Sequence, residues 1–134
     1  MSDEIRFASE HIRACSVSGL PDVSYKRRLL RPGLTVQIES TGPGARLVQN
    51  AHCSVAAMRV SDDQPVLNGG ATPDTVVPGT NGTHATMVWH FNELSLPHCG
   101  EFYYVIQVFA YDGVSSHFTP LLTDISEVVR IVED

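Results

Sequence analysis

The sequence has few of the features that mark membrane, disordered or disulfide-rich proteins. Its wholly apolar runs are only a few residues long, whereas a helix needs roughly 20 apolar residues to cross a bilayer, so we expect no membrane association. Charged residues make up 18% of the 134 residues and hydrophobic residues 43%, which excludes a disordered chain. Three cysteines are too few, and of the wrong parity, for a disulfide framework. We expect Cys15, Cys53 and Cys99 to be free and mostly buried thiols.

Secretory and enzymatic motifs are missing as well. The chain starts with acids where a secretory signal places lysines, which predicts an intracellular protein. It contains no glycine-rich phosphate loop, no nucleophile elbow, no His-Glu-x-x-His and no Cys-x-x-Cys. We therefore expect a protein that binds macromolecules, and no enzyme activity or cofactor.

Two sets of residues could bind a metal ion by their residue types. The pairs His52–Cys53 and His98–Cys99 hold residue types that bind zinc. Neighbours on a strand point to opposite faces, so each pair offers one ligand to a common site unless it lies in a loop. Asp62, Asp63 and Asp112 lack the spacing of a calcium loop. We expect solvated acids, buried thiols and surface imidazoles, and no metal.

Short apolar stretches separated by Pro and Gly predict an all-β chain. Strict alternation over 34–39 puts Leu34, Val36 and Ile38 on one face of a strand. The stretch 61–82 is rich in Pro, Gly, Asp, Asn and Thr, and we interpret it as loops. Further strands are expected over 83–91 and 101–111, and one or two more over 114–126 and 127–132. The alanines of 52–60 would also suit a helix, but its short length and the Ser-Asp-Asp that follows favour a strand.

The expected architecture is one domain over residues 1–134, with about seven strands in an immunoglobulin-like or Rel-like sandwich of two antiparallel sheets joined by long loops. The segment 101–111 is apolar on both faces. Such a strand is either central in a sandwich or partly covered by a partner subunit, and the sequence does not separate these cases.

Charge is unevenly distributed along a chain whose net charge is −6. Seven of the nine Lys and Arg residues lie in the first fifty positions, against five acids, whereas the remainder has two bases against ten acids. This asymmetry is typical of a basic binding edge on an acidic body.

The densest basic stretch is Tyr25, Lys26, Arg27 and Arg28, followed by Arg31, just before the strand at 34–39. A basic loop on a rigid β scaffold can contact DNA phosphates, and arginine can also read guanine edges. The alternative is a solvated turn whose charges only keep the chain soluble.

Three collinear segments along the chain form a recognisable order. The first joins 11–15 (His-Ile-Arg-Ala-Cys), the basic 26–28 and 30–38 (Leu-Arg-Pro-Gly-Leu-Thr-Val-Gln-Ile). The second is 47–50 (Leu-Val-Gln-Asn), and the third is 91–103 (Phe-Asn-Glu-Leu-Ser-Leu-Pro-His-Cys-Gly-Glu-Phe-Tyr). Each motif alone is common, whereas their order over nearly the whole chain is fairly specific. This order resembles the velvet domain of fungal transcriptional regulators.

The resemblance implies a Rel-like sandwich that binds double-stranded DNA through its N-terminal basic region and forms homodimers or heterodimers with other velvet proteins. It also implies a regulator of development, sporulation and secondary metabolism, in the nucleus and secondarily in the cytoplasm. Carried over residue by residue, DNA contact falls on Lys26, Arg27 and Arg28, with Arg31 and Arg13 as neighbours. The alternative is a velvet-like dimerisation module with no direct DNA contact, because the acidic remainder repels DNA.

Overall fold

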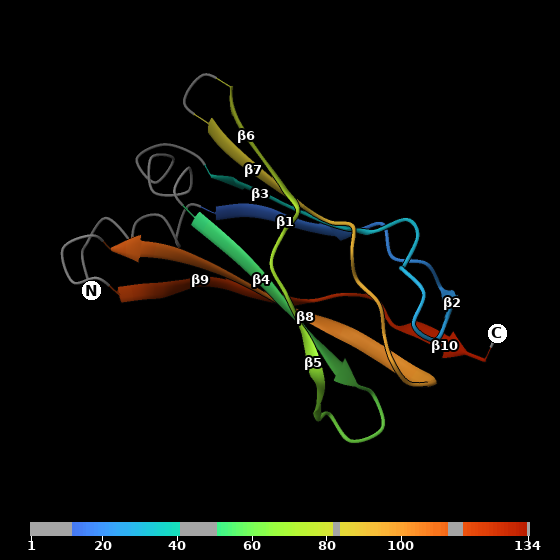
Figure 1. Cartoon of the computed structure of the whole chain (residues 1–134). Helices are drawn as coiled ribbons and strands as arrows, with labels where there is room; N and C mark the ends of the chain where they lie inside the picture. The colour runs from blue at the N-terminus through green and yellow to red at the C-terminus, as the bar shows by residue number, and fades with distance from the viewer. Residues whose placement is uncertain (1–11, 41–50, 82–83, 113–116, 134) are drawn as a thin grey trace.

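The computed structural model describes residues 12–40, 51–81, 84–112 and 117–133. This part of the chain contains ten strands and no helix. Accordingly, no helix in it is long and apolar enough to cross a membrane. The strands form two sheets that pack against each other (Figure 1). The predicted all-β sandwich is confirmed.

The first sheet has four strands in the order β1-β3-β7-β6, all antiparallel. Their bounds are Ile12–Ser18 for β1, Leu34–Ser40 for β3, His84–Phe91 for β7 and Thr75–Asn81 for β6.

The second sheet has six strands in the order β2-β10-β8-β4-β5, with β9 also paired to β8. Their bounds are Val23–Tyr25 for β2, Val129–Val132 for β10, Gly100–Asp112 for β8, Ala51–Arg59 for β4, Pro65–Ala71 for β5 and His117–Ile125 for β9. The short pair β2–β10 is parallel, a departure from the expected purely antiparallel sheets. Figure 1 shows this pair at one end of the molecule, beside the C-terminus.

The core lies between the sheets and is built from alternate residues of each strand. Leu34, Val36 and Ile38 of β3 are fully buried, as their alternation predicts. The core face of β7 is also as expected, with Ala85, Met87, Trp89 and Phe91 buried.

Strand β8 is central in its sheet, with β4 on one side and β9 and β10 on the other. Its inner face is buried by Phe102, Tyr104, Ile106 and Val108. Its outer face carries Tyr103, Val105 and Phe109, which remain half-exposed. The central position therefore accounts for the buried half of the two-faced pattern and leaves an apolar outer face.

The loop prediction for 61–82 is wrong, because β5 and β6 lie there. Both are edge strands, paired on one side only. An edge strand tolerates proline and polar residues because half of its backbone groups need no strand partner, and Pro78 lies inside β6. Strands β1 and β2 also formed without a clear periodic signal, which raises the count from about seven to ten.

The connection from β1 to β2 contacts the start of β3 through Gly19. Its φ is +96°, and a Cβ added there would lie 2.3 Å from the Gly33 carbonyl oxygen. Only glycine fits such a close approach in this conformation. This contact joins the chain before β2 to the end of the basic segment after it.

Candidate nucleic-acid interface

The basic loop, residues 26–33, leaves β2 and is attached to the framework by backbone hydrogen bonds. The Lys26 N–H donates to the Val132 carbonyl at 3.2 Å, and the Arg27 N–H donates to the Leu96 carbonyl at 2.8 Å. The Leu30 N–H donates to the Leu94 carbonyl at 2.8 Å. The loop is thus held by β10 and by the β7–β8 connection, two segments far away in the sequence.

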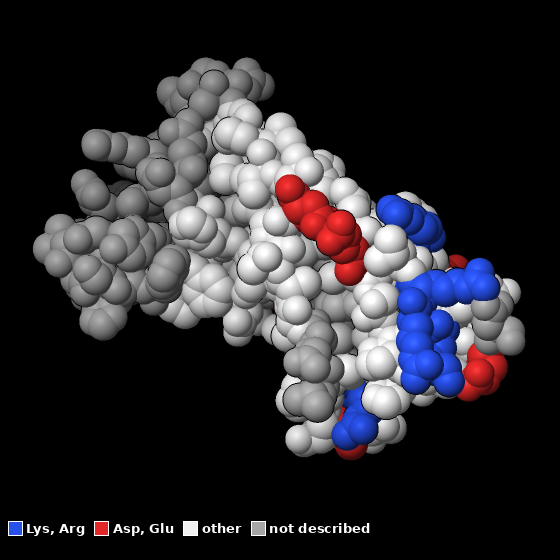
Figure 2. All heavy atoms as spheres, viewed as in Figure 1, with Lys and Arg blue, Asp and Glu red and all other residues white. Residues whose placement is uncertain are grey.

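Leu30 anchors the loop to the hydrophobic core. Its side chain is fully buried in the core, between neighbours that are exposed. Because the anchor points inward, the exposed side chains of Arg27, Arg28 and Arg31 are presented to solvent on both sides of it. Figure 2 shows Lys and Arg atoms gathered at the end of the molecule where β2 and β10 lie.

Local geometry fixes two of the arginines. Arg27 has a φ of 64°, in the left-handed region that non-glycine residues seldom adopt. The Arg28 guanidinium lies over the Tyr25 ring, 5.6 Å from its centroid, in a cation–π contact. The turn therefore has a defined backbone at Arg27, and the Arg28 side chain packs on Tyr25.

Lys26 is paired within the chain. Its Nζ donates to Glu133 Oε1 at 2.9 Å, and the Cys99 thiol donates to the same oxygen at 3.6 Å. The hydrogen bond from Lys26 is the largest of the effects that lower the pKa of Glu133, and the charge of Arg27 adds to them. The side chain of Glu133 is 74% exposed, so water and solutes reach this pair freely.

Arg13 lies apart from the other four residues that are predicted to contact DNA. It is in β1, opposite Glu39 of β3, in the four-stranded sheet. Figure 1 shows β1 entering its sheet at the end of the molecule opposite β2. The structure brings Lys26, Arg27, Arg28 and Arg31 together and leaves Arg13 outside the group.

The residues weighed as metal ligands do not converge. His52 is exposed and Cys53 is buried, on opposite faces of β4 as their spacing predicts. Cys99 is exposed, against the expectation of a buried thiol, while the side chain of Cys15 lies outside the described part. Within the described ranges no three His, Cys, Asp or Glu side chains group as metal ligands.

The acids weighed for calcium are engaged by protein groups. The Asp62 carboxylate accepts a hydrogen bond from the Arg59 guanidinium at 2.8 Å, and the Asp63 carboxylate accepts one from the Tyr103 hydroxyl at 2.9 Å. Asp112 ends β8, and its side chain lies outside the described part.

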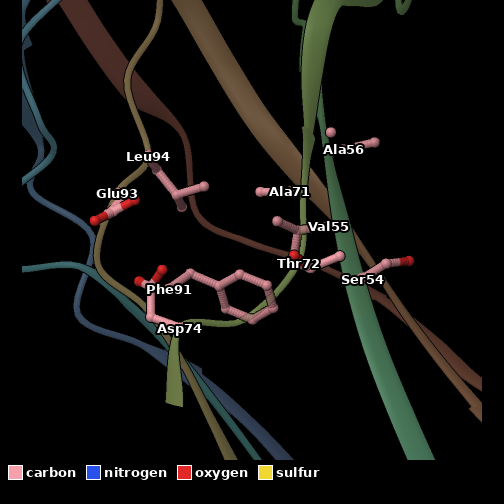
Figure 3. A pocket seen from close by; sticks show the side chains of 10 residues that line it. Ser54, Val55, Ala56, Ala71, Thr72, Asp74, Phe91, Glu93 and Leu94 are labelled. Atoms are coloured by element: carbon pink, nitrogen blue, oxygen red, sulfur yellow. The ribbon is translucent and has the colours of Figure 1, made fainter. Parts of the chain in front are cut away.

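A hollow of about 670 Å³ opens between β4–β5 and the end of β7. Figure 3 shows Asp74, Phe91, Glu93 and Leu94 on one side of it, facing small residues of β4 and β5. Asp74 is occupied as an acceptor for the Asn92 backbone N–H. The described lining holds the Ser54 hydroxyl and the Asp74 and Glu93 carboxylates, and it contains no His, Cys or Lys.

The chain matches no known protein-family model and no curated protein.

Sequence reasoning identified the cations of the loop but missed the groups that hold them. Glu133, Cys99 and the carbonyls of Leu94 and Leu96 come from segments about 65 to 107 residues away. No spacing rule links such distant positions. The strand expected over 127–132 was the one signal that this segment joins a sheet.

Proposed function

We propose that this protein is a DNA-binding transcriptional regulator and that its basic loop contacts the phosphates of duplex DNA. The observation that carries the proposal is the anchored loop. Exposed Arg27, Arg28 and Arg31 surround the buried Leu30 at one end of the sandwich. Cations on a loop that a rigid scaffold positions are suited to contact DNA phosphates.

The order of velvet-like motifs supports the same proposal from the sequence. A velvet-like regulator acts in the nucleus as a homodimer or as a heterodimer with another velvet protein, and it controls development, sporulation and secondary metabolism. This role requires binding and no catalysis.

Electrostatics restrict how DNA can approach. Positive charge gathers at the β2–β10 end, whereas an acidic patch lies nearer the middle of the same face (Figure 2). DNA that touches only the basic end avoids this repulsion, and two such ends in a dimer double the number of phosphate contacts.

The test compares the wild type with a triple variant, Lys26→Gln, Arg27→Gly and Arg28→Gln. Glycine accepts the left-handed backbone of position 27 without strain. Fluorescence anisotropy with a labelled duplex over a salt series should show weaker binding and a salt slope shallower by up to about 3.

Arg27→Gly and Arg59→Gln form a matched control pair, because each removes one positive charge. Arg59 lies outside the loop and is paired with Asp62. Arg27→Gly should weaken binding more than Arg59→Gln. Equal affinity and slope in the wild type and the triple variant would contradict a contact role for the loop.

A dimerisation module without DNA contact is the second candidate. The outer face of β8 favours it, because half-exposed Val105 lies opposite Ile125, which is 60% exposed. An apolar outer face is a usual site of protein–protein contact.

A further inference from the structure

We propose that the Glu133 carboxylate occupies the position of a DNA phosphate in the basic loop and that binding DNA displaces it. This inference rests on the proposed function and specifies how that same site is regulated. The Glu133 side-chain carboxylate then competes with the polyanion for Lys26.

The geometry defines one anion position. Two donors from different segments, Lys26 Nζ at 2.9 Å and Cys99 Sγ at 3.6 Å, converge on a single oxygen, Glu133 Oε1. Lys26 Nζ is held near this point because its own backbone N–H is bonded to Val132, the residue before Glu133. A phosphate oxygen has the charge and acceptor capacity of the carboxylate oxygen that it would replace.

The exposed fractions of the Lys26 and Glu133 side chains favour replacement of the carboxylate by a phosphate. The Lys26 side chain is only 29% exposed, whereas that of Glu133 is 74% exposed. The lysine is therefore the supported member of the pair, and the carboxylate is the one that can move away. An exposed ion pair contributes little free energy, so a duplex that also contacts Arg27 and Arg28 can displace it.

The competitor acts on affinity and on salt dependence. In the wild type, DNA must first break the Lys26–Glu133 pair, and it then lies near an uncompensated carboxylate. Glu133→Gln removes both obstacles. We expect it to bind duplex DNA about two- to five-fold more tightly and with a salt slope steeper by up to about 1.

Glu127→Gln is the matched control. Glu127 is an exposed acid between β9 and β10, and its replacement changes the net charge by the same amount. If general repulsion by the acidic body were the cause, both variants would gain equally. Tighter binding restricted to Glu133→Gln supports the phosphate position.

Alkylation of Cys99 by iodoacetamide, measured by mass spectrometry of the Cys99 peptide, gives a readout that does not depend on DNA. Loss of the neighbouring carboxylate favours the reactive thiolate, so Glu133→Gln should react faster than the wild type and Glu127→Gln should not. Duplex DNA should slow the reaction in the wild type. Inorganic phosphate at the same ionic strength should not, because one phosphate does not also reach Arg27 and Arg28.

The outcomes separate the two proposals. If neither the wild type nor Glu133→Gln binds DNA at low salt, the proposed function fails, and the phosphate position fails with it. If both bind but Glu133→Gln behaves like Glu127→Gln, only the phosphate position is overturned. If inorganic phosphate protects Cys99 as well as the duplex does, the site recognises free phosphate, and a DNA occupant is overturned.

Discussion

Lys26, Arg27 and Arg28 are consecutive in the chain, yet each has a different environment. Lys26 is paired with Glu133, Arg27 is exposed on a left-handed backbone, and Arg28 lies over Tyr25. A count of charges treats them as equivalent. Under the proposed function, Arg27 meets DNA directly, whereas Lys26 does so only after Glu133 leaves.

Residue types that carry charge could be read from the sequence, but their partners could not. The Tyr103–Asp63 hydrogen bond joins β8 to the turn after β4, a contact that depends on the register of the sheet. The Asp63 carboxylate accepts a hydrogen bond from the Tyr103 hydroxyl, and this bond raises the pKa of Tyr103. Ionising the phenol would lose this hydrogen bond and bring two negative charges together.

Replacing Asp63 with Asn should therefore lower the pKa of Tyr103. Asparagine also suits the φ of 53° at this position, so the turn is retained. Ultraviolet titration of tyrosinate should show one phenol ionising at lower pH than in the wild type. The same comparison in a Tyr103→Phe background should show no difference, and an unshifted titration would contradict the hydrogen bond.

The raised pKa of Tyr103 determines how the stability of the fold changes with pH. The stability that this hydrogen bond contributes is fully present below the ordinary tyrosine pKa, and it is lost as the pH rises through the raised value. Wild type should accordingly lose more stability than Asp63→Asn over that alkaline range.

Among the elements, strands with strict alternation were predictable, and edge strands were not. The strands β3, β7 and β8 each have a buried face that the sequence pattern reveals, whereas β4 was favoured by its short length and by the polar residues that follow it. In contrast, β6 exposes Val76 and Val77 and contains Pro78, so its sequence looks like a loop. It becomes a strand because β7 supplies its hydrogen-bonding partners. This is a tertiary effect that the local sequence does not reveal.

The two faces of β8 should differ in their effect on stability. Ile106 is fully buried, so Ile106→Ala leaves a cavity and should destabilise the fold by about 2–5 kcal/mol. Val105→Ala, on the half-exposed outer face, should cost about 1 kcal/mol or less. Urea unfolding followed by the fluorescence of Trp89, the single tryptophan and a buried one, measures both.

Equal losses at the two positions would contradict the two-layer assignment of β8. An outer face that is as sensitive as the core would mean that a partner covers it in solution. Repeating the unfolding at several protein concentrations separates these cases, because only a covered face makes the midpoint depend on concentration.

At the scale of the whole molecule, the charge asymmetry of the sequence becomes an arrangement in space. The basic loop, β2 and β10 form one end of the sandwich, where Glu133 pairs with Lys26, and an acidic patch lies nearer the middle of the same face (Figure 2). The fold class and the position of the loop before β3 were predictable from composition and periodicity. The parallel β2–β10 pair, which attaches the C-terminus to the loop, was not, because it joins residues more than a hundred positions apart.

Among the described residues, this arrangement gathers positive charge at the β2–β10 end. Non-specific attraction to DNA would then orient the protein before any base is read. A partner with its own basic surface would strengthen binding by adding phosphate contacts, which is the role that the velvet-like motifs imply for a second subunit.

The most direct test of the central claim is a titration of isotope-labelled protein with a short duplex, monitored by amide chemical shifts at low and at moderate salt. The account predicts that the shifts gather on residues 23–33, Leu96 and Val132 and fade as salt increases. Shifts confined to the outer face of β4, β8 and β9, or no shifts at low salt, would contradict it.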